Sequence, residues 1–189
     1  CFPSEIAKFR LVLLHGWGAD ADDLMPLGKE LIKGMGESVE LVSLNAPYVH
    51  PQGFGRQWYS LFPADWIEAE KSVIDLRLRL ENVSTLEVPL EKTVLFGFSQ
   101  GGAMAIASGC GLPLAGLIIC SGYPHKNLIF SGKLPPVFLS HGNEDPVVPK
   151  QATKELVKLI EQSNKSPQTE LFEGGHEIPE SIYKEITNF

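Results

Sequence analysis

The sequence predicts an α/β fold in which a mostly parallel sheet is covered by helices on both faces. Apolar segments alternate along the chain with segments of helical periodicity, and the apolar segments are nearly continuous. Strands of a parallel sheet are buried on both faces and therefore carry apolar residues at consecutive positions. Reactive residue types also follow three of these segments directly, which agrees with sites that form at the carboxyl ends of parallel strands.

The individual elements follow from these patterns. In the helix expected at 65–83, Trp66, Val73, Leu76, Leu80 and Val83 fall on one face. Strands are expected at 10–14, 39–44, 92–96, 115–120, 136–140 and 169–172. Helices are expected at 21–33, 65–83, 100–108, 150–162 and 179–187. With 189 residues and no repeat or linker, we expect a single domain, 1–189.

Composition limits the classes of partner. The net charge is −7 and no polybasic stretch is present, so we expect neither a nucleic-acid partner nor stable membrane association. The longest apolar runs, such as 112–120, are too short to span a bilayer, and no signal peptide is visible. A cytoplasmic location is therefore expected.

The three cysteines, Cys1, Cys110 and Cys120, are odd in number and widely spaced. This spacing argues against a disulfide framework and against a zinc site, and favours buried free thiols. No other cluster has the spacing of metal ligands. We therefore expect no metal and no other cofactor.

The most informative segment is Gly97-Phe98-Ser99-Gln100-Gly101, which lies between an apolar strand pattern and a helix of small residues. Strand, sharp turn and helix are the context of a nucleophile elbow, in which a strained Ser99 exposes its hydroxyl above the sheet. The glycines allow the tight turn. The alternative is a glycine-rich turn whose serine caps a helix.

Asp145 and His176 complete a catalytic constellation. Each directly follows an expected strand, and the chain order Ser99, Asp145, His176 is the order of α/β-hydrolases. A serine hydroxyl needs an imidazole to take its proton, and the imidazole needs a carboxylate to fix its tautomer. Glu144 is the main rival acid. Weaker rivals are Asp65, Asp75, His15, His50, His125 and His141.

An oxyanion hole needs one backbone N–H from the loop after the first strand and one from the residue after the nucleophile. These donors are assigned to Trp17 and Gln100, with His15 and Gly16 as alternatives for the first. Because the hole uses backbone donors, the His15 side chain is expected to structure the loop.

The segment 47–62 is long, aromatic and bracketed by prolines, which is typical of a functional loop. It could form a pocket wall for an apolar substrate, or a flap packed on the core. Arg56 and Gln57 could orient a polar end of the substrate. The pocket is expected to be lined from Trp17, Trp58, Leu61, Phe62, Phe98 and Val147.

These motifs resemble the phospholipase/carboxylesterase family, which includes acyl-protein thioesterases and small bacterial carboxylesterases. The resemblance rests on five ordered blocks: 14–18 (LHGWG), 97–102 (GFSQGG), 121–122 (SG), 141–149 (HGNEDPVVP) and 175–178 (GHEI). It implies that 1–189 is a single compact α/β-hydrolase domain without a large cap domain, and that the substrates are esters or thioesters. It also implies the triad Ser99, Asp145 and His176, with Trp17 and Gln100 as oxyanion donors. The chain is short for the family, and segment 47–62 differs from the eukaryotic thioesterase pattern.

The main hypothesis is a serine carboxylesterase that cleaves small-molecule esters of small to medium acyl chain length through an acyl-enzyme intermediate. An acyl thioesterase or lysophospholipase acting on long chains is the alternative. A non-catalytic binding protein on a hydrolase scaffold is a third, remote possibility. The sequence leaves open whether the protein is a monomer or a homodimer.

Overall fold

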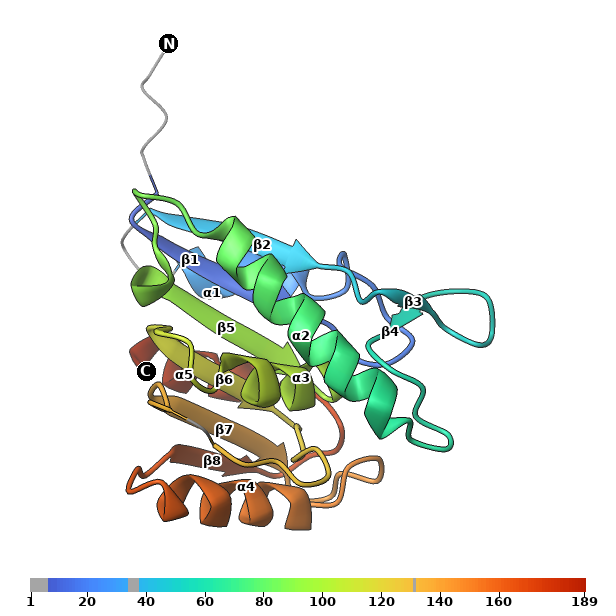
Figure 1. Ribbon diagram of the computed structural model, residues 1–189. Helices are drawn as coiled ribbons and strands as arrows, with labels where there is room; N and C mark the ends of the chain where they lie inside the picture. Colours follow the sequence, from blue (N-terminus) through green and yellow to red (C-terminus); the bar gives the residue numbers. More distant parts are fainter. Residues whose placement is uncertain (1–6, 34–37, 131) are drawn as a thin grey trace.

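The computed structural model describes residues 7–33, 38–130 and 132–189, and these are built around a six-stranded sheet (Figure 1). Every neighbouring pair of strands is parallel, as the sequence predicts. The strand order is β2 (Val39–Leu44), β1 (Phe9–Leu14), β5 (Thr93–Phe98), β6 (Gly116–Cys120), β7 (Val137–Gly142) and β8 (Gln168–Phe172). The β2 bounds are those expected, and the other strands shift by one or two residues.

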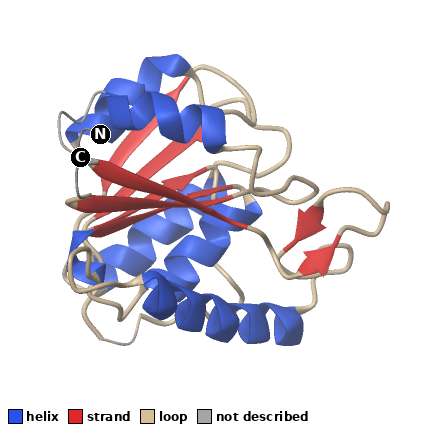
Figure 2. Ribbon diagram, turned by 90° about the horizontal axis from the view of Figure 1, so that it is seen from above, coloured by secondary structure: helices blue, strands red, loops and turns tan. Residues whose placement is uncertain are grey.

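Helices cover both faces of this sheet (Figures 1 and 2). One face carries α1 (Met25–Lys33) and α5 (Tyr183–Asn188), and the other carries α2 (Trp66–Val83), α3 (Gln100–Gly109) and α4 (Gln151–Gln162). Short 3-10 turns lie at Leu90–Lys92 and Glu180–Ile182. The latter takes up the start of the helix expected at 179–187.

The first helix begins later than the expected residue 21. Asp20 accepts a hydrogen bond at its side-chain oxygen from the Asp22 N–H (3.0 Å), and its carbonyl accepts from the Asp23 N–H (3.3 Å). Aspartate side chains often bond to the backbone two residues on and so favour a turn over a helix. Residues 21–24 therefore form a turn, and α1 starts at Met25.

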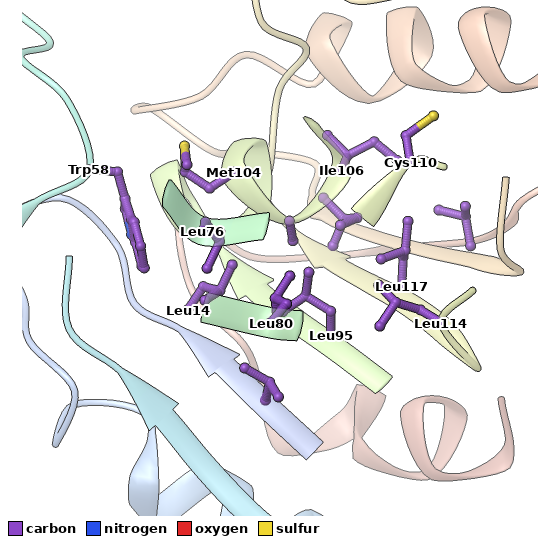
Figure 3. Packing of buried hydrophobic residues seen from close by; sticks show 14 of the residues in the cluster. Leu14, Trp58, Leu76, Leu80, Leu95, Met104, Ile106, Cys110, Leu114 and Leu117 are labelled. Atoms are coloured by element: carbon purple, nitrogen blue, oxygen red, sulfur yellow. The ribbon is translucent and has the colours of Figure 1, made fainter. Parts of the chain in front are cut away.

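Successive strand residues face opposite layers, which explains the continuous apolar runs. In β1, Val12 and Leu14 pack toward α2, α3 and α4, whereas Leu11 and Leu13 pack toward α1 and α5. All four side chains are at most 1% exposed. Figure 3 shows the first of these clusters, in which side chains of α2 and α3 pack against those of the strands. Burial of each such side chain contributes roughly 1.5–3 kcal/mol.

Strands are added to the sheet in opposite directions from β1 and β5, since β2 lies on one side of β1 and the later strands lie on the other side. This is the topological switch point of an open parallel sheet, where the loops after two neighbouring strands separate and leave a crevice. The loops that follow β1, β5, β7 and β8 all lie at the carboxyl edge of the sheet, which places the candidate site there.

The segment 47–62 contains a small antiparallel hairpin of β3 (Tyr48–Val49) and β4 (Arg56–Gln57). The hairpin projects beyond the carboxyl edge of the sheet (Figures 1 and 2). The sequence predicts no strand here, because two-residue strands are too short to show a period.

Cys110 and Cys120 are buried free thiols, as expected, whereas Cys1 lies outside the described residues. Burial raises the pKa of the Cys120 thiol to about 12. None of the helices in the described ranges has the length and apolar character needed to cross a membrane.

Candidate active site

Ser99 occupies a sharp turn between β5 and α3. Its backbone angles are φ 55° and ψ −119°, a strained conformation for a residue with a Cβ. The Ser99 N–H donates to the Cys120 carbonyl (2.9 Å), which holds the turn to the neighbouring strand. A Cβ at Gly101 would lie 2.1 Å from the Leu14 carbonyl oxygen, so the elbow can approach the loop after β1 this closely only with glycine there.

His176 links the two other predicted residues. Its Nε2 lies 2.9 Å from Ser99 Oγ, and its Nδ1 lies 2.7 Å from Asp145 Oδ2. An ionised carboxylate can only accept hydrogen bonds, so Nδ1 carries the proton and Nε2 presents its lone pair to the serine hydroxyl. The structure thus brings Ser99, His176 and Asp145 into the hydrogen-bonded row that a serine hydrolase needs.

The Asp145 carboxylate is fully buried and engaged on both oxygens. Oδ1 accepts from the backbone N–H groups of Val147 (2.8 Å) and Val148 (2.9 Å), while Oδ2 accepts from His176. Burial by itself would raise the pKa of Asp145, but these three hydrogen bonds outweigh it and hold the pKa below its usual value. The rival Glu144 is exposed, and its N–H donates to the Gly174 carbonyl (3.0 Å).

The loop that carries the acid and the loop that carries the histidine are packed backbone to backbone. A Cβ at Gly142 would lie 2.2 Å from the Gly175 carbonyl oxygen. The Asn143 N–H also donates to the Phe172 carbonyl (2.8 Å). These contacts fix the distance between Asp145 and His176.

Trp17 and Gln100, the predicted oxyanion donors, lie in segments that adjoin Ser99. Neither backbone N–H donates to an acceptor within the described parts of the chain. Gln100 opens α3, where the first N–H groups of a helix have no intrahelical partner. The loop of Trp17 abuts the nucleophile, since a Cβ at Gly16 would lie 3.5 Å from Ser99 Cβ.

Residues 56–58 hold the loop of Trp17, the predicted oxyanion loop, in place. The Gly18 N–H donates to the Arg56 carbonyl (2.8 Å), and the Arg56 N–H donates to the Ala19 carbonyl (2.8 Å). The Trp17 indole N–H donates to Gln57 Oε1 (2.9 Å). The Arg56 guanidinium donates to two backbone carbonyls of residues 46–47. Arg56 and Gln57 therefore support the loop, in contrast to the suggestion that they orient a substrate.

His15 is a structural member of the same loop. Its Nδ1–H donates to the Gly16 carbonyl (2.7 Å), and its Nε2 accepts from the Ala46 N–H (3.1 Å). A ring that accepts a hydrogen bond at Nε2 is neutral, in agreement with burial, which lowers the pKa of His15. The His15 side chain orders the loop, as the sequence favours.

Trp58 does not line the pocket, contrary to expectation. It is fully buried, and its indole N–H donates to the His15 carbonyl (2.9 Å). Its backbone N–H donates to Gln100 Oε1 (3.0 Å), so the side chain of Gln100 holds the segment against which the oxyanion loop rests.

Phe98 also lies outside the hollow beside Ser99. Its ring packs on that of His176, at 4.8 Å between the ring centroids.

A hollow of about 280 Å³ opens beside Ser99. It contains three of the predicted pocket residues, namely Leu61, Phe62 and Val147, whereas Trp17 instead packs edge-on against Phe62 and His50. The hollow is lined by Leu61, Phe62, Ser99, Tyr123, Val147, Val148, Pro149 and Ala152. A larger hollow of about 530 Å³ between residues 124–128 and α4 contains none of the three triad residues.

Sequence reasoning missed two residues of this site. Tyr123 lines the hollow, and nothing in its local pattern marks it. His141 is fully buried behind Asp145, with Nε2–H donating to the Val148 carbonyl (2.7 Å) and Nδ1 lying 2.8 Å from Thr153 Oγ1. Its Nε2 also lies 3.4 Å from Asp145 Oδ2. The position of His141 four residues before Asp145 is the signal that could identify it, whereas the sequence pattern alone marks it only as a rival to His176.

No group of three or more His, Cys, Asp or Glu side chains within the described ranges is placed to hold a metal ion. The site thus consists of a serine, an imidazole, a carboxylate and backbone donors at the carboxyl edge of a parallel sheet. This combination defines a class, the serine hydrolases of α/β-hydrolase fold.

Comparison with known proteins gives the family. Residues 3–189 match the phospholipase/carboxylesterase family. Acyl-protein thioesterase 1 of Candida albicans is 27% identical over 97% of this chain and 91% of its own length. Acyl-protein thioesterase 1 of Yarrowia lipolytica is 30% identical over 73% of this chain and 70% of its own length.

Among solved structures, esterase PE8 is 30% identical with a TM-score of 0.87, covering 98% of this chain and 92% of that one. A carboxylesterase from Mesorhizobium loti shares the fold with a TM-score of 0.82 at 16% identity, over 97% of this chain and 88% of that one. The chain belongs to the phospholipase/carboxylesterase family of hydrolases.

Proposed function

We propose that this protein is a carboxylesterase that hydrolyses small-molecule esters of small to medium acyl chain length, with Ser99 as nucleophile. The observation that carries the proposal is the row of hydrogen bonds from Ser99 through His176 to Asp145, which ends beside a small apolar hollow. Esterase PE8, at 30% identity, supports the same reaction class.

In the first half of the reaction, Ser99 Oγ attacks the ester carbonyl while its proton passes to His176 Nε2. The resulting imidazolium is stabilised by the buried Asp145 carboxylate. The carbonyl oxygen becomes an oxyanion that accepts hydrogen bonds from the Trp17 and Gln100 N–H groups, at the positive end of α3. His176 then returns its proton to the departing alcohol, which leaves an acyl-Ser99.

In the second half, His176 removes a proton from water, which attacks the acyl carbon, and the same donors hold the second oxyanion. Collapse of this intermediate breaks the bond to Ser99 and returns the proton to Oγ. Fixed donors lower the barrier because little reorganisation is needed as the charge develops. The hydrogen bonds between residues 56–58 and the oxyanion loop supply that rigidity.

The hollow indicates the size of the substrate. Its volume of about 280 Å³ lies just below the range of ligand pockets, which span roughly 300–1,000 Å³. Each methylene buried there should gain about 0.8 kcal/mol, roughly fourfold in kcat/KM. The gain should stop once the chain outgrows the hollow.

Ser99→Ala tests the proposal. The variant should fold normally and lose nearly all esterase activity on p-nitrophenyl butyrate, because no other group takes the place of Oγ. A fluorophosphonate probe should label the wild type at Ser99. Exposed Ser166→Ala is the matched control and should retain both labelling and activity. An active Ser99→Ala variant, or labelling at another residue, would refute the assignment.

The acyl-protein thioesterase relatives motivate a second candidate, hydrolysis of long-chain thioesters or lysophospholipids. A series of p-nitrophenyl esters of rising acyl length separates the two functions. We expect the optimum at short to medium chains, without a jump in rate at the micellar threshold. A kcat/KM that keeps rising to palmitoyl length would favour the second candidate.

A further inference from the structure

The hollow beside Ser99 is apolar except at one point. Of its eight lining residues, Tyr123 is the one that brings a polar side chain in addition to the nucleophile. Tyr123 is half-buried. It lies three residues after Cys120, the last residue of β6, whose carbonyl accepts a hydrogen bond from the Ser99 N–H. Ligand pockets typically combine apolar walls with a few fixed polar groups that determine specificity. The role of this hydroxyl therefore depends on whether its hydrogen is available to a substrate.

The Tyr123 hydroxyl is paired with that of Tyr59 at 2.9 Å between the oxygens. Tyr59 is fully buried, and the Tyr123 oxygen is the acceptor that the described chain offers to the hydroxyl hydrogen of Tyr59. If Tyr123 donated instead, the Tyr59 hydrogen would be buried without an acceptor, which costs about 1–3 kcal/mol. Tyr59 therefore donates, and Tyr123 accepts.

The surroundings of this pair keep both hydroxyls neutral. Gln100 Nε2 donates to the Tyr59 carbonyl (2.8 Å), which anchors the backbone of Tyr59 beside the start of α3. Burial raises the pKa of Tyr59, the bond to Tyr123 raises it further, and Gln100 opposes the shift. Burial also raises the pKa of Tyr123, to about 12, and the hydrogen bond with Tyr59 opposes that shift. Both phenols stay protonated at neutral pH.

With its oxygen accepting from Tyr59, Tyr123 keeps its own hydrogen, which is then free to donate to a substrate in the hollow that Tyr123 lines. We propose that the Tyr123 hydroxyl is a specificity-determining donor that selects esters carrying a second oxygen acceptor, such as an ether or keto oxygen, over plain alkyl esters. This inference rests on the proposed esterase function and names the substrate class of that site. A plain alkyl chain would leave the hydroxyl desolvated and without a partner.

Pairs of esters with equal numbers of heavy atoms test this. In the acyl arm, p-nitrophenyl 3-methoxypropionate is compared with p-nitrophenyl pentanoate. In the alcohol arm, 2-methoxyethyl acetate is compared with butyl acetate. The arm in which the ether is favoured identifies the part of the substrate that enters the hollow. Each kcat/KM ratio of ether to alkyl ester is measured for the wild type and for Tyr123→Phe, which removes only the hydroxyl.

In one arm, Tyr123→Phe should lower the ether-to-alkyl ratio by about three- to tenfold, the effect of one lost hydrogen bond. Tyr183→Phe is the matched control, because Tyr183 lies on α5, on the face of the sheet opposite to α2, α3 and α4. This variant should leave both ratios unchanged. Since Tyr123→Phe strands the Tyr59 hydroxyl, the double variant Tyr59→Phe/Tyr123→Phe is included. It removes both hydroxyls and should show the same loss.

The ratio separates a specificity role from a structural one, because a merely distorted site would slow both members of a pair. Ratios unchanged by Tyr123→Phe in both arms, in an enzyme that hydrolyses all four esters, would overturn this inference and leave the proposed function intact. A wild type that hydrolyses none of them would overturn the proposed function and this inference with it.

Discussion

The Asp145 carboxylate shows how single contacts set the chemistry of this site. Two backbone N–H groups on Oδ1 leave Oδ2 to face the imidazole, so the acid can hold His176 in one orientation. His141 packs behind the same carboxylate, with Nε2 lying 3.4 Å from Oδ2, and its ring is held by the Val148 carbonyl and by Thr153 of α4. Because Asp145 lies at the centre of these bonds, its replacement isolates the role of the acid.

Asp145→Asn should lower kcat by about 10⁴-fold, since an asparagine amide favours the wrong histidine tautomer. Glu144→Gln is the control, and its exposed side chain should change kcat less than twofold, roughly the ±0.5 kcal/mol of a neutral surface change. Steady-state kinetics on a p-nitrophenyl ester measures both. The reverse result would make Glu144 the triad acid.

At the scale of the element, helix α3 has Ser99 of the candidate site at its N-terminus and a contact with α2 at its C-terminus. Its first residues follow Ser99 directly, while its last carbonyls are capped by Arg77 of α2. The guanidinium donates to the carbonyls of Ala107 (3.3 Å), Ser108 (3.0 Å) and Cys110 (2.7 Å). A cation at the C-terminus of a helix satisfies otherwise unpaired carbonyls and interacts favourably with the helix dipole.

Arg77→Met keeps the aliphatic part of the side chain and removes the cap. The free energy of unfolding should fall by about 1.5–3 kcal/mol, the contribution of a charge-assisted hydrogen bond in a partly buried setting. Urea denaturation monitored by circular dichroism measures this. Lys71→Met, an exposed change on the same helix, should stay within about 0.5 kcal/mol. Equal effects of the two variants would contradict the capping role.

At the scale of the whole molecule, several buried groups make the fold sensitive to acid. Burial lowers the pKa of His125 to about 4 and also lowers the pKa of His15, while hydrogen bonds lower that of Asp145 against the effect of burial. In the unfolded chain His125 takes up a proton near pH 6.5, whereas in the folded chain it does so only near pH 4. Acidification between these values therefore favours the unfolded state.

The stability contribution of His125 is present above about pH 6.5 and is lost as the pH falls toward 4, at up to about 1.4 kcal/mol per pH unit. His125→Phe preserves the ring contacts with Tyr59 and Trp66 and removes the titration. Urea unfolding at pH 7.5, 6 and 5 should show a flatter pH dependence in this variant. An unchanged slope would mean that other groups cause the acid sensitivity.

Much of the fold follows from short stretches of sequence. Strand β1 is recognisable because burial on both faces demands consecutive apolar residues, and α2 because its apolar residues recur at helical spacing. The strand–turn–helix context of Ser99 is also local. The positions of Asp145 and His176 just after strands could also be predicted from local sequence. Because parallel strands bring their carboxyl ends to one edge, such residues are expected to meet there.

Tertiary contacts alone decided the rest, chiefly in segment 47–62. Whether Trp58 faces a pocket or the core depends on acceptors at His15 and Gln100, about forty residues away in either direction, and no local period encodes such a contact. The same holds for Tyr123, whose role follows from its pairing with Tyr59 across 64 positions. The sequence by itself determined most of the elements and the candidate residues that meet at the carboxyl edge of the sheet, because these depend on neighbouring residues. The lining of the hollow was decided by the packing of distant loops, because the direction of a loop side chain is set by its partners in space.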